Sequence, residues 1–302
     1  MSHAALVILN PVSGRGRATR LWWRLRRGLQ VRFPHLVVYE TTGPRDAGRR
    51  AAAWAEAGER GPILLMGGDG TLHEVVNELF RGRWNLPIGV IPSGTGNDFA
   101  RNAGIPLDPD LAAGRLEEGS GKPLDLGRLS FRDRAGVERS VVFLNSTSVG
   151  VSPVANRHAR RLGYVAGGVV ALLTAPRRRF TVTEAGRIIH EGKTLNITVA
   201  NGAGFGGGLR ISPDSSPWDG VLERVIIGRI ELGRALLAFA RLRRGGHVGM
   251  REVSITRTAG TTVIEPEGAL TQVEADGHDF LAAGRITVSV EAAAIRVLGT
   301  GS

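Results

Sequence analysis

The sequence predicts an N-terminal α/β domain with a parallel sheet, followed by a C-terminal antiparallel β-sandwich domain. In the first 105 residues, buried-strand runs alternate with helical stretches. Strands that alternate with helices pair in parallel through right-handed crossovers. From about residue 125, short β runs separated by turn signals dominate, as in a sandwich or barrel. The polar stretch "EEGSGKP" (117–123) marks the boundary between the two patterns. We therefore expect domains at 1–125 and 126–292, and we expect the last strand, about 293–302, to return to the first domain.

Four strands are expected in the first domain, at 5–10, 35–42, 62–66 and 86–92. The helix after the first strand carries Leu21, Trp22, Leu25 and Leu29 on one face. A second helix is expected over 46–58, and others follow the third and fourth strands. Ligands of such sheets lie beyond the carboxyl ends of the strands. Glycine-rich turns follow three of the four strands, so we expect these turns to converge on one ligand.

The second domain is expected to contain short strands interrupted by two helical inserts, at 153–174 and 231–243. The expected strands are 125–131, 140–151, 179–186, 194–202, 221–228, 253–258, 261–266, 270–275 and 285–299. The insert 152–180 combines an apolar centre with basic flanks. A membrane-surface element has this composition, and so does an ordinary amphipathic helix packed on the sandwich, which we favour.

Composition restricts the partners of the protein. The net charge is +11, and only Lys122 and Lys193 are lysine, so the basic residues are almost all arginine. This excess reflects either general arginine usage or an acidic partner such as anionic lipid or nucleotide. No helix-turn-helix or aromatic-and-basic platform supports nucleic-acid binding. The absence of cysteine fits a reducing compartment, and the longest apolar stretch, 164–176, is shorter than the roughly 20 residues that span a bilayer. We expect a cytoplasmic protein in peripheral contact with the anionic inner face of the membrane; a homodimer is left open.

The stretch "LLMGGDGTLHEVVNEL" (64–79) has the layout of a phosphate-binding turn. Glycines let the backbone approach a phosphate, and a helix N-terminus offers free N–H groups. Thr71 and Glu74 have the spacing of a capping box. Asp69 is unexpected there, because a carboxylate repels a phosphate. It is tolerable if Mg²⁺ bridges it to the phosphates or if it takes a proton from an attacking hydroxyl, and both belong to phosphoryl transfer. The alternative is that the glycines only make a tight turn.

Eight motifs together resemble the diacylglycerol kinase catalytic-domain family, specifically the soluble bacterial lipid kinases. They occur in the family's order: "NPVSGRGRA" (10–18), "TTGPRDA" (41–47), "GGDGTLHEVVNEL" (67–79), "IPSGTGNDFAR" (91–101), "LDLG" (124–127), "FLNSTSVG" (143–150), "NGAGFGGGLRISPDSSPWDG" (201–220) and "VEADG" (273–277). The resemblance runs nearly from end to end. The wider superfamily also contains NAD kinases.

The resemblance implies a three-layer α/β domain and a β-sandwich domain with the active site between them. It implies ATP and Mg²⁺ as cofactors and a lipid hydroxyl as acceptor. It places Asp69 at the transfer site, linked through metal and water to Asp125. The residues that it implies around the nucleotide are Asn10, Ser13, Gly14, Arg15, Thr41, Gly68, Asp69, Gly70, Thr71, Glu74 and Thr95.

One motif departs from the family pattern. The family's C-terminal signature is Asp-Gly-Glu, whose glutamate is usually assigned as the proton acceptor. Here the sequence reads Asp276-Gly277-His278-Asp279. The candidate proton acceptors are therefore Asp276 and His278, aided by Asp69. His278 is able to act as a base near neutral pH, but its presence also favours a catalytically inactive protein.

The resemblance also implies a structural Mg²⁺ site in "SSPWDGV" (215–221). Asp219, Ser216 and the Val221 carbonyl have the matching spacing, and a plain Asp-Gly turn is the equal alternative. An NAD kinase-like or other small-molecule kinase, and an inactive nucleotide- or lipid-binding protein, stay open as alternatives to an ATP-dependent lipid kinase. The sequence does not identify the lipid.

Overall fold

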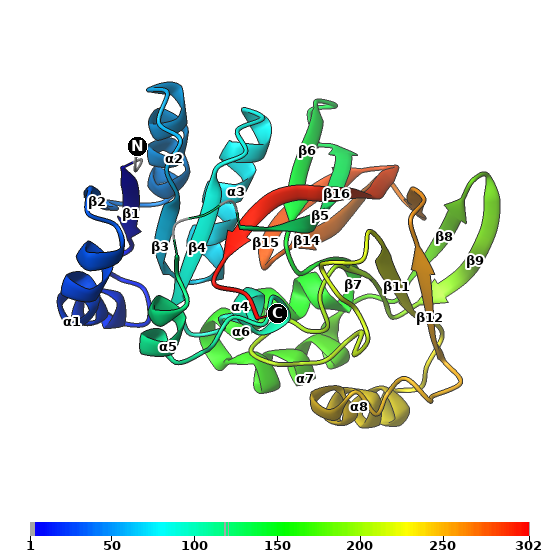
Figure 1. The fold of residues 1–302 in the computed structure, drawn as a ribbon. Helices are drawn as coiled ribbons and strands as arrows, with labels where there is room; N and C mark the ends of the chain where they lie inside the picture. Colours follow the sequence, from blue (N-terminus) through cyan, green and yellow to red (C-terminus); the bar gives the residue numbers. More distant parts are fainter. Residues whose placement is uncertain (1–3, 118, 120, 302) are drawn as a thin grey trace. The chain divides into compact units, whose positions relative to one another are not determined.

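The computed structural model describes residues 4–117, 119 and 121–301, and its fold is drawn in Figure 1. The chain forms two compact units. The first contains Met1–Asp125 and Ala292–Ser302, and the second contains Leu126–Glu291. Two long strands, β5 (Lys122–Arg132) and β16 (Ile286–Leu298), contribute residues to both units.

The first unit is an α/β domain with a parallel sheet. Its strands are β1 (Ala5–Leu9), β2 (Leu36–Glu40), β3 (Ile63–Gly67) and β4 (Pro87–Pro92), in the order β2-β1-β3-β4. The C-terminal end of β16 pairs with β4 in parallel, with Arg296 opposite Pro87. Every residue of β1 and β3 is buried, because strands covered on both faces are apolar throughout.

Helices cover the sheet of the first unit. They are α1 (Arg17–Arg32), α2 (Asp46–Glu56), α3 (Asp69–Arg81), α4 (Asp98–Asn102) and α5 (Pro109–Gly114). Val7 and Leu9 pack with Leu21 and Leu29 of α1. Since side chains alternate along a strand, Leu6 of β1 faces the opposite side, and it is also fully buried. Helices α2 and α3 pack against each other and contact β1 and β3 respectively.

The second unit is an antiparallel β-sandwich. One sheet has the order β12-β11-β10-β7-β14-β15, and the other contains β16-β13-β8-β9, with β5 joining β16 to β6. Val149 and Val273 of the first sheet pack with Phe180, Ile264 and Val288 of the second, so the core lies between the sheets. The strands are β6 (Glu138–Phe143), β7 (Ser146–Gly150), β8 (Arg178–Glu184), β9 (Arg187–Thr194), β10 (Asn196–Ala200), β11 (Leu222–Ile227), β12 (Val253–Thr258), β13 (Thr262–Pro266), β14 (Leu270–Ala275) and β15 (His278–Ala283). The predicted fold class is thereby confirmed.

The helical inserts differ in detail from the prediction. The insert expected over 153–174 is two helices, α6 (Val151–Leu162) and α7 (Tyr164–Thr174), which lie side by side (Figure 1). Gly163, at φ 79°, separates them. The second insert forms α8 (Leu232–Arg241) and the short 3₁₀ turn η1 (Leu242–Arg244). Within the described part of the chain, no helix has both the length and the apolar character needed to cross a membrane.

Candidate active site

Three glycine-containing loops meet at the carboxyl ends of β1, β3 and β4. The backbone N–H and the hydroxyl of Ser93 both donate to the Gly67 carbonyl, at 3.2 and 3.1 Å. Asn10 Nδ2 donates to Thr71 Oγ1 at 2.9 Å and so joins the first loop to α3. The convergence predicted from the strand order therefore occurs within the first unit.

Glycine is required where these loops touch. A Cβ on Gly14 would lie 2.1 Å from the Ser93 carbonyl oxygen, and Gly14 has a φ of +55°. A Cβ on Gly94 would lie 2.5 Å from the Gly68 Cα. Real Cβ atoms do not approach backbone so closely, so neither position accepts a side chain without a shift of the loop. The loops present backbone rather than side chains, as a surface that receives phosphate does.

Asp69 connects two of the loops directly. Its carboxylate accepts hydrogen bonds from the backbone N–H groups of Asp98, at 3.2 Å, and Phe99, at 3.0 Å. These groups belong to the first turn of α4, whose N-cap residue Asn97 makes no side-chain cap. Asp69 thus caps α4 from the first turn of α3. This role was not predicted, because Asn97 is itself a preferred N-cap residue and nothing in the local sequence indicates a distant acceptor.

The capping box predicted for Thr71 and Glu74 is wrong. Helix α3 begins at Asp69, with Gly68 as its N-cap and no side-chain cap. The Thr71 hydroxyl accepts from Asn10 instead, and Glu74 Oε1 accepts from the backbone N–H of Arg45 at 2.9 Å. Thr71 and Glu74 therefore bond to residues that are distant in the sequence rather than to the start of their own helix.

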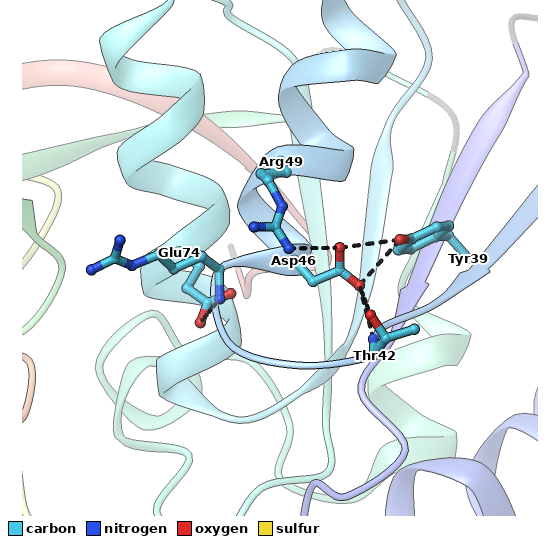
Figure 2. Close-up of polar contacts among 6 residues, drawn as sticks. Tyr39, Thr42, Asp46, Arg49 and Glu74 are labelled. Carbon is cyan, nitrogen blue, oxygen red and sulfur yellow. Dashed lines mark hydrogen bonds and ion pairs between the residues drawn. The ribbon is translucent and has the colours of Figure 1, made fainter.

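The turn between β2 and α2 is braced by Asp46, as Figure 2 shows. The buried Asp46 carboxylate accepts from the Thr42 backbone N–H at 2.8 Å, the Thr42 hydroxyl at 3.0 Å and the Tyr39 hydroxyl at 3.1 Å. The Thr42 N–H, together with the other donors, holds the pKa of Asp46 below its ordinary value despite burial. The hydrogen bond to Asp46 raises the pKa of Tyr39. Asp46, which the sequence analysis did not select, fixes the turn that carries the buried Thr41.

The other predicted nucleotide-binding residues lie on the same loops. Asn10 Oδ1 accepts from the Val12 N–H at 3.2 Å, which folds the first loop back on itself. Ser13 is buried, whereas Arg15 and Thr95 are exposed at the loop surfaces. Arg15, at φ 58°, adopts a left-handed conformation. The structure therefore gathers the predicted residues in the first unit, with Arg15 and Thr95 open to solvent.

Asp125, predicted to act with Asp69, is buried in β5. One of its carboxylate oxygens accepts from the Ala293 N–H at 2.7 Å. Ala293 has a φ of 51°, which is uncommon for a residue with a Cβ. Asp125 thus stabilises an irregularity in β16.

In the second unit, Asp276 occupies a two-residue hairpin turn with Gly277. Both residues have positive φ, at 47° and 80°, as type I′ turns require. The Asp276 carboxylate accepts from the N–H groups of Leu144 at 2.7 Å, Asn145 at 2.8 Å and Ser146 at 3.3 Å. Both oxygens therefore hold the turn before β7. Asp276 therefore positions the backbone of residues 144–146.

His278 is half-buried and lies opposite Ala275 across the same hairpin. Glu274 is a buried acid on the other face of this strand pair from His278. Its partner in the strand register is Asp279. Glu274 Oε2 accepts from the Gly277 N–H at 3.0 Å. Burial raises the pKa of Glu274 to about 8, against the hydrogen bonds from Gly277 and Ser148. Glu274 is thus mostly protonated at neutral pH; sequence reasoning passed over it because one glutamate among strand residues carries no pattern.

The contacts of the predicted Asp219 metal site do not favour a metal. The Asp219 carboxylate is paired with the Arg257 guanidinium, and its Oδ1 accepts from the Val221 N–H at 3.3 Å. The Arg257 guanidinium thus already neutralises Asp219, which is the one carboxylate among the three predicted metal ligands. Over residues 4–117, 119 and 121–301, no group of three or more histidine, aspartate or glutamate side chains is arranged to hold a metal ion. Asp219, Ser216 and Val221 would receive an ion only if Arg257 moved away.

Comparison with known proteins gives the family of this chain. Residues 4–129 match the diacylglycerol kinase catalytic domain, and residues 145–299 match the YegS C-terminal NAD kinase beta sandwich-like domain. The chain belongs to the diacylglycerol kinase family of lipid kinases.

Two relatives support this membership. The chain is 31% identical to "Diacylglycerol kinase" of Mycobacterium tuberculosis, over 96% of this chain and 93% of the relative. It is 36% identical to "Probable lipid kinase YegS-like" of Pseudomonas aeruginosa (strain PAO1), over 64% and 62% of the two chains.

Solved structures share the fold. A diacylglycerol kinase structure from Bacillus anthracis str. Sterne superposes with a TM-score of 0.74 at 20% identity, covering 99% of this chain and 97% of that one. Yeast NADH kinase in complex with NADH gives a TM-score of 0.54 at 11% identity, covering 100% and 84%. The fold is therefore common to lipid kinases and nicotinamide-nucleotide kinases.

Proposed function

We propose that this protein is an ATP-dependent lipid kinase that transfers the γ-phosphate of ATP to a lipid hydroxyl such as that of diacylglycerol. The observation that carries the proposal is the convergence of the three glycine loops with a carboxylate, Asp69, held among them. Beside a phosphate the Asp69 charge is repulsive, and an uncharged side chain could also cap α4, whereas phosphoryl transfer uses a carboxylate to hold the metal or orient the acceptor. Membership of a kinase family supports the same conclusion.

The first unit would bind the nucleotide. Backbone N–H groups of the loops at 10–16 and 67–71 would receive the phosphates, and the exposed Arg15 would neutralise part of their charge. Mg²⁺ usually binds through one or two carboxylates together with the phosphates of the nucleotide, so the ion would arrive with ATP. Asp69 and Asp125 are the acids that would hold it, and it would offset the phosphate charge.

The second unit would bind the lipid and supply His278. In the reaction, the lipid hydroxyl oxygen forms a bond to the γ-phosphorus, the bond from that phosphorus to the bridging oxygen of ADP breaks, and ADP leaves. His278 accepts the hydroxyl proton. We assign this role to His278 rather than Asp276, because both Asp276 oxygens accept backbone hydrogen bonds. The reaction would take place at the cytoplasmic face of the membrane, where the protein is peripheral.

A nicotinamide-nucleotide kinase is the alternative that the fold itself supports, through its likeness to yeast NADH kinase. An acceptor panel distinguishes the two. The purified protein is incubated with Mg²⁺ and ATP, and with either NAD or mixed micelles of diacylglycerol, phosphatidylglycerol, a sphingoid base or a polyprenol. We expect mass spectrometry to find one or more phosphorylated lipids and no phosphorylated NAD.

The matched controls for this panel are Asp69→Asn and Asp133→Asn. Both remove one carboxylate charge, but Asp133 lies in the exposed β5–β6 hairpin, where it pairs with Arg139. Loss of lipid phosphorylation with Asp69→Asn alone supports the proposal. Phosphorylated NAD, or no phosphorylated product with any acceptor, would overturn it.

A further inference from the structure

We propose that a cationic cavity in the second unit binds a phosphate group at a site formed by residues other than those assigned to phosphoryl transfer. The cavity measures about 500 Å³ and is lined by Arg177, Arg179, Lys193 and Arg229, with Glu231 as its one acidic residue. Four cations and one anion leave it with a net charge of +3. The residues come from the start of β8, the end of β9 and the segment between β11 and α8. The proposed function uses none of them.

The cations are placed together at a cost. Arg179 and Lys193 lie directly opposite each other in the β8–β9 register, and like charges at opposed positions destabilise a strand pair. Glu191 relieves this only in part, because its nearest approach to Arg179 is 4.0 Å. In the part of the chain that the structure describes, no carboxylate lies within ion-pair distance of Arg177, Lys193 or Arg229. A bound anion would remove the repulsion.

A helix start adds to the positive potential. Helix α8 begins at Leu232, which lines the cavity, and its N-cap residue Glu231 makes no side-chain cap. The N-terminal end of a helix carries a partial positive charge from its first N–H groups. The cations, rather than this helix end, define the site.

Phosphate is the anion that fits these groups best. Arginine presents a planar fork of donors that matches two phosphate oxygens at once, and a lysine ammonium adds a compact charge. The cavity is larger than a phosphate group needs, and Leu195, Ile230 and the 40%-exposed Leu232 give it apolar walls. These walls suit a phosphate that is attached to a larger molecule, such as the headgroup of an anionic phospholipid. Free phosphate has the same charged group, so the experiment must separate the two sources.

The test compares two double variants with the same change in charge. Lys193→Gln/Arg229→Gln removes two cavity cations. Arg134→Gln/Arg285→Gln removes two exposed arginines of the same unit that do not line the cavity. Binding is measured without ATP, so the result does not depend on the proposed kinase activity. Calorimetry follows inorganic phosphate and soluble dihexanoyl phosphatidic acid, and sedimentation follows vesicles of phosphatidylcholine with and without phosphatidylglycerol.

We expect wild-type protein to bind the anionic vesicles and the cavity variant to bind them on the order of tenfold to thirtyfold more weakly, since each basic residue near a membrane surface contributes about 1 kcal/mol. The control variant should lose clearly less. Binding should fall with added salt, because exposed charges are screened beyond about 8 Å at physiological ionic strength. Loss for the vesicles and for dihexanoyl phosphatidic acid, with inorganic phosphate unaffected, identifies a lipid headgroup, whereas an equal loss for inorganic phosphate identifies free phosphate.

Equal losses in the two variants would show that binding depends on diffuse charge and would overturn the site. Absence of binding to every probe, at any salt concentration, would overturn it as well. Melting curves check that each variant is folded, and Arg229→Lys, which keeps the charge, should retain most of the affinity.

Discussion

Asp69 combines a structural role with the chemical one proposed for it. The sequence predicted that a carboxylate in a phosphate turn must serve metal or proton chemistry. The structure adds that both carboxylate oxygens accept backbone hydrogen bonds from the start of α4. This could not be read from the sequence, because Asp69 and its donors are separated by 29 and 30 residues and meet only after β3 and β4 have paired. The same holds for Glu274, whose burial depends on the neighbouring strands.

Glu274 should make folding stability depend on pH. Burial raises its pKa to about 8, against an ordinary 4.5. Between these values the folded state retains a proton that the unfolded state releases, so the free energy of unfolding falls as pH rises. The slope for one such group is at most about 1.4 kcal/mol per pH unit. We expect urea unfolding to show a flatter profile from about pH 5 to 8 for Glu274→Gln than for wild type.

The matched control for this experiment is Glu138→Gln, at an exposed glutamate of β6 whose side chain is 81% accessible. It should leave the wild-type pH profile unchanged. If wild type and Glu274→Gln show the same slope, Glu274 ionises normally in the folded protein.

His278 should control turnover. Since only a neutral imidazole can accept a proton, activity should fall as the pH is lowered. His278→Ala should lower kcat on the order of 10²–10⁴-fold, the usual contribution of a general base. His278→Glu should restore much of the rate and move the acidic limb of the pH–rate profile to lower pH. Wild-type kcat and an unshifted pH–rate profile in His278→Ala would show that another residue accepts the proton.

At the scale of elements, the pattern of apolar residues correctly predicted those strands whose burial follows from their own sequence. The apolar runs of β1 and β3 predicted strands buried on both faces, and all their residues are buried. Helix starts were less predictable. Thr71 and Glu74 have capping-box spacing, yet the Thr71 side chain accepts a hydrogen bond from Asn10 and the Glu74 side chain accepts one from the backbone of Arg45. The insert 153–174 divides at Gly163, because its left-handed backbone ends one helix and starts the next.

The contact between the first and fourth strand loops should depend on Gly14. Gly14→Ala would place a Cβ 2.1 Å from the Ser93 carbonyl oxygen at a φ of +55°. We expect a destabilisation of about 1–3 kcal/mol in urea unfolding, as for other overpacked sites, and weaker ATP binding in calorimetry. Gly28→Ala is the control, since Gly28 lies within α1 with open space around it. It should stabilise the protein by roughly 0.5–1 kcal/mol.

Unchanged stability and ATP affinity in Gly14→Ala would show that the loops tolerate a side chain there. The close approach of these loops would then not be part of nucleotide binding.

At the scale of the whole molecule, the alternation of strands and helices, followed by short β runs, predicted the fold class correctly. The order of motifs predicted the family. The lipid acceptor and the metal could not be predicted, because they depend on how side chains from distant segments meet. The Arg257–Asp219 pair is an example, since 38 residues separate the partners and nothing in the Asp-Gly turn indicates it. The cationic cavity is another, since its basic residues are scattered over 177–229.

The proposed reaction moves the terminal phosphate of ATP to a lipid hydroxyl with the help of Asp69. The most direct test supplies ATP labelled with ¹⁸O on its γ-phosphate to wild type and Asp69→Asn, with diacylglycerol micelles as acceptor, and measures the mass of the lipid product. We predict labelled phosphatidic acid from wild type and none from Asp69→Asn. The variant should still fold, with a melting temperature lowered slightly because an amide has one acceptor oxygen where the carboxylate has two. Near-normal labelling by Asp69→Asn, or release of the label only as inorganic phosphate by wild type, would contradict the proposed reaction.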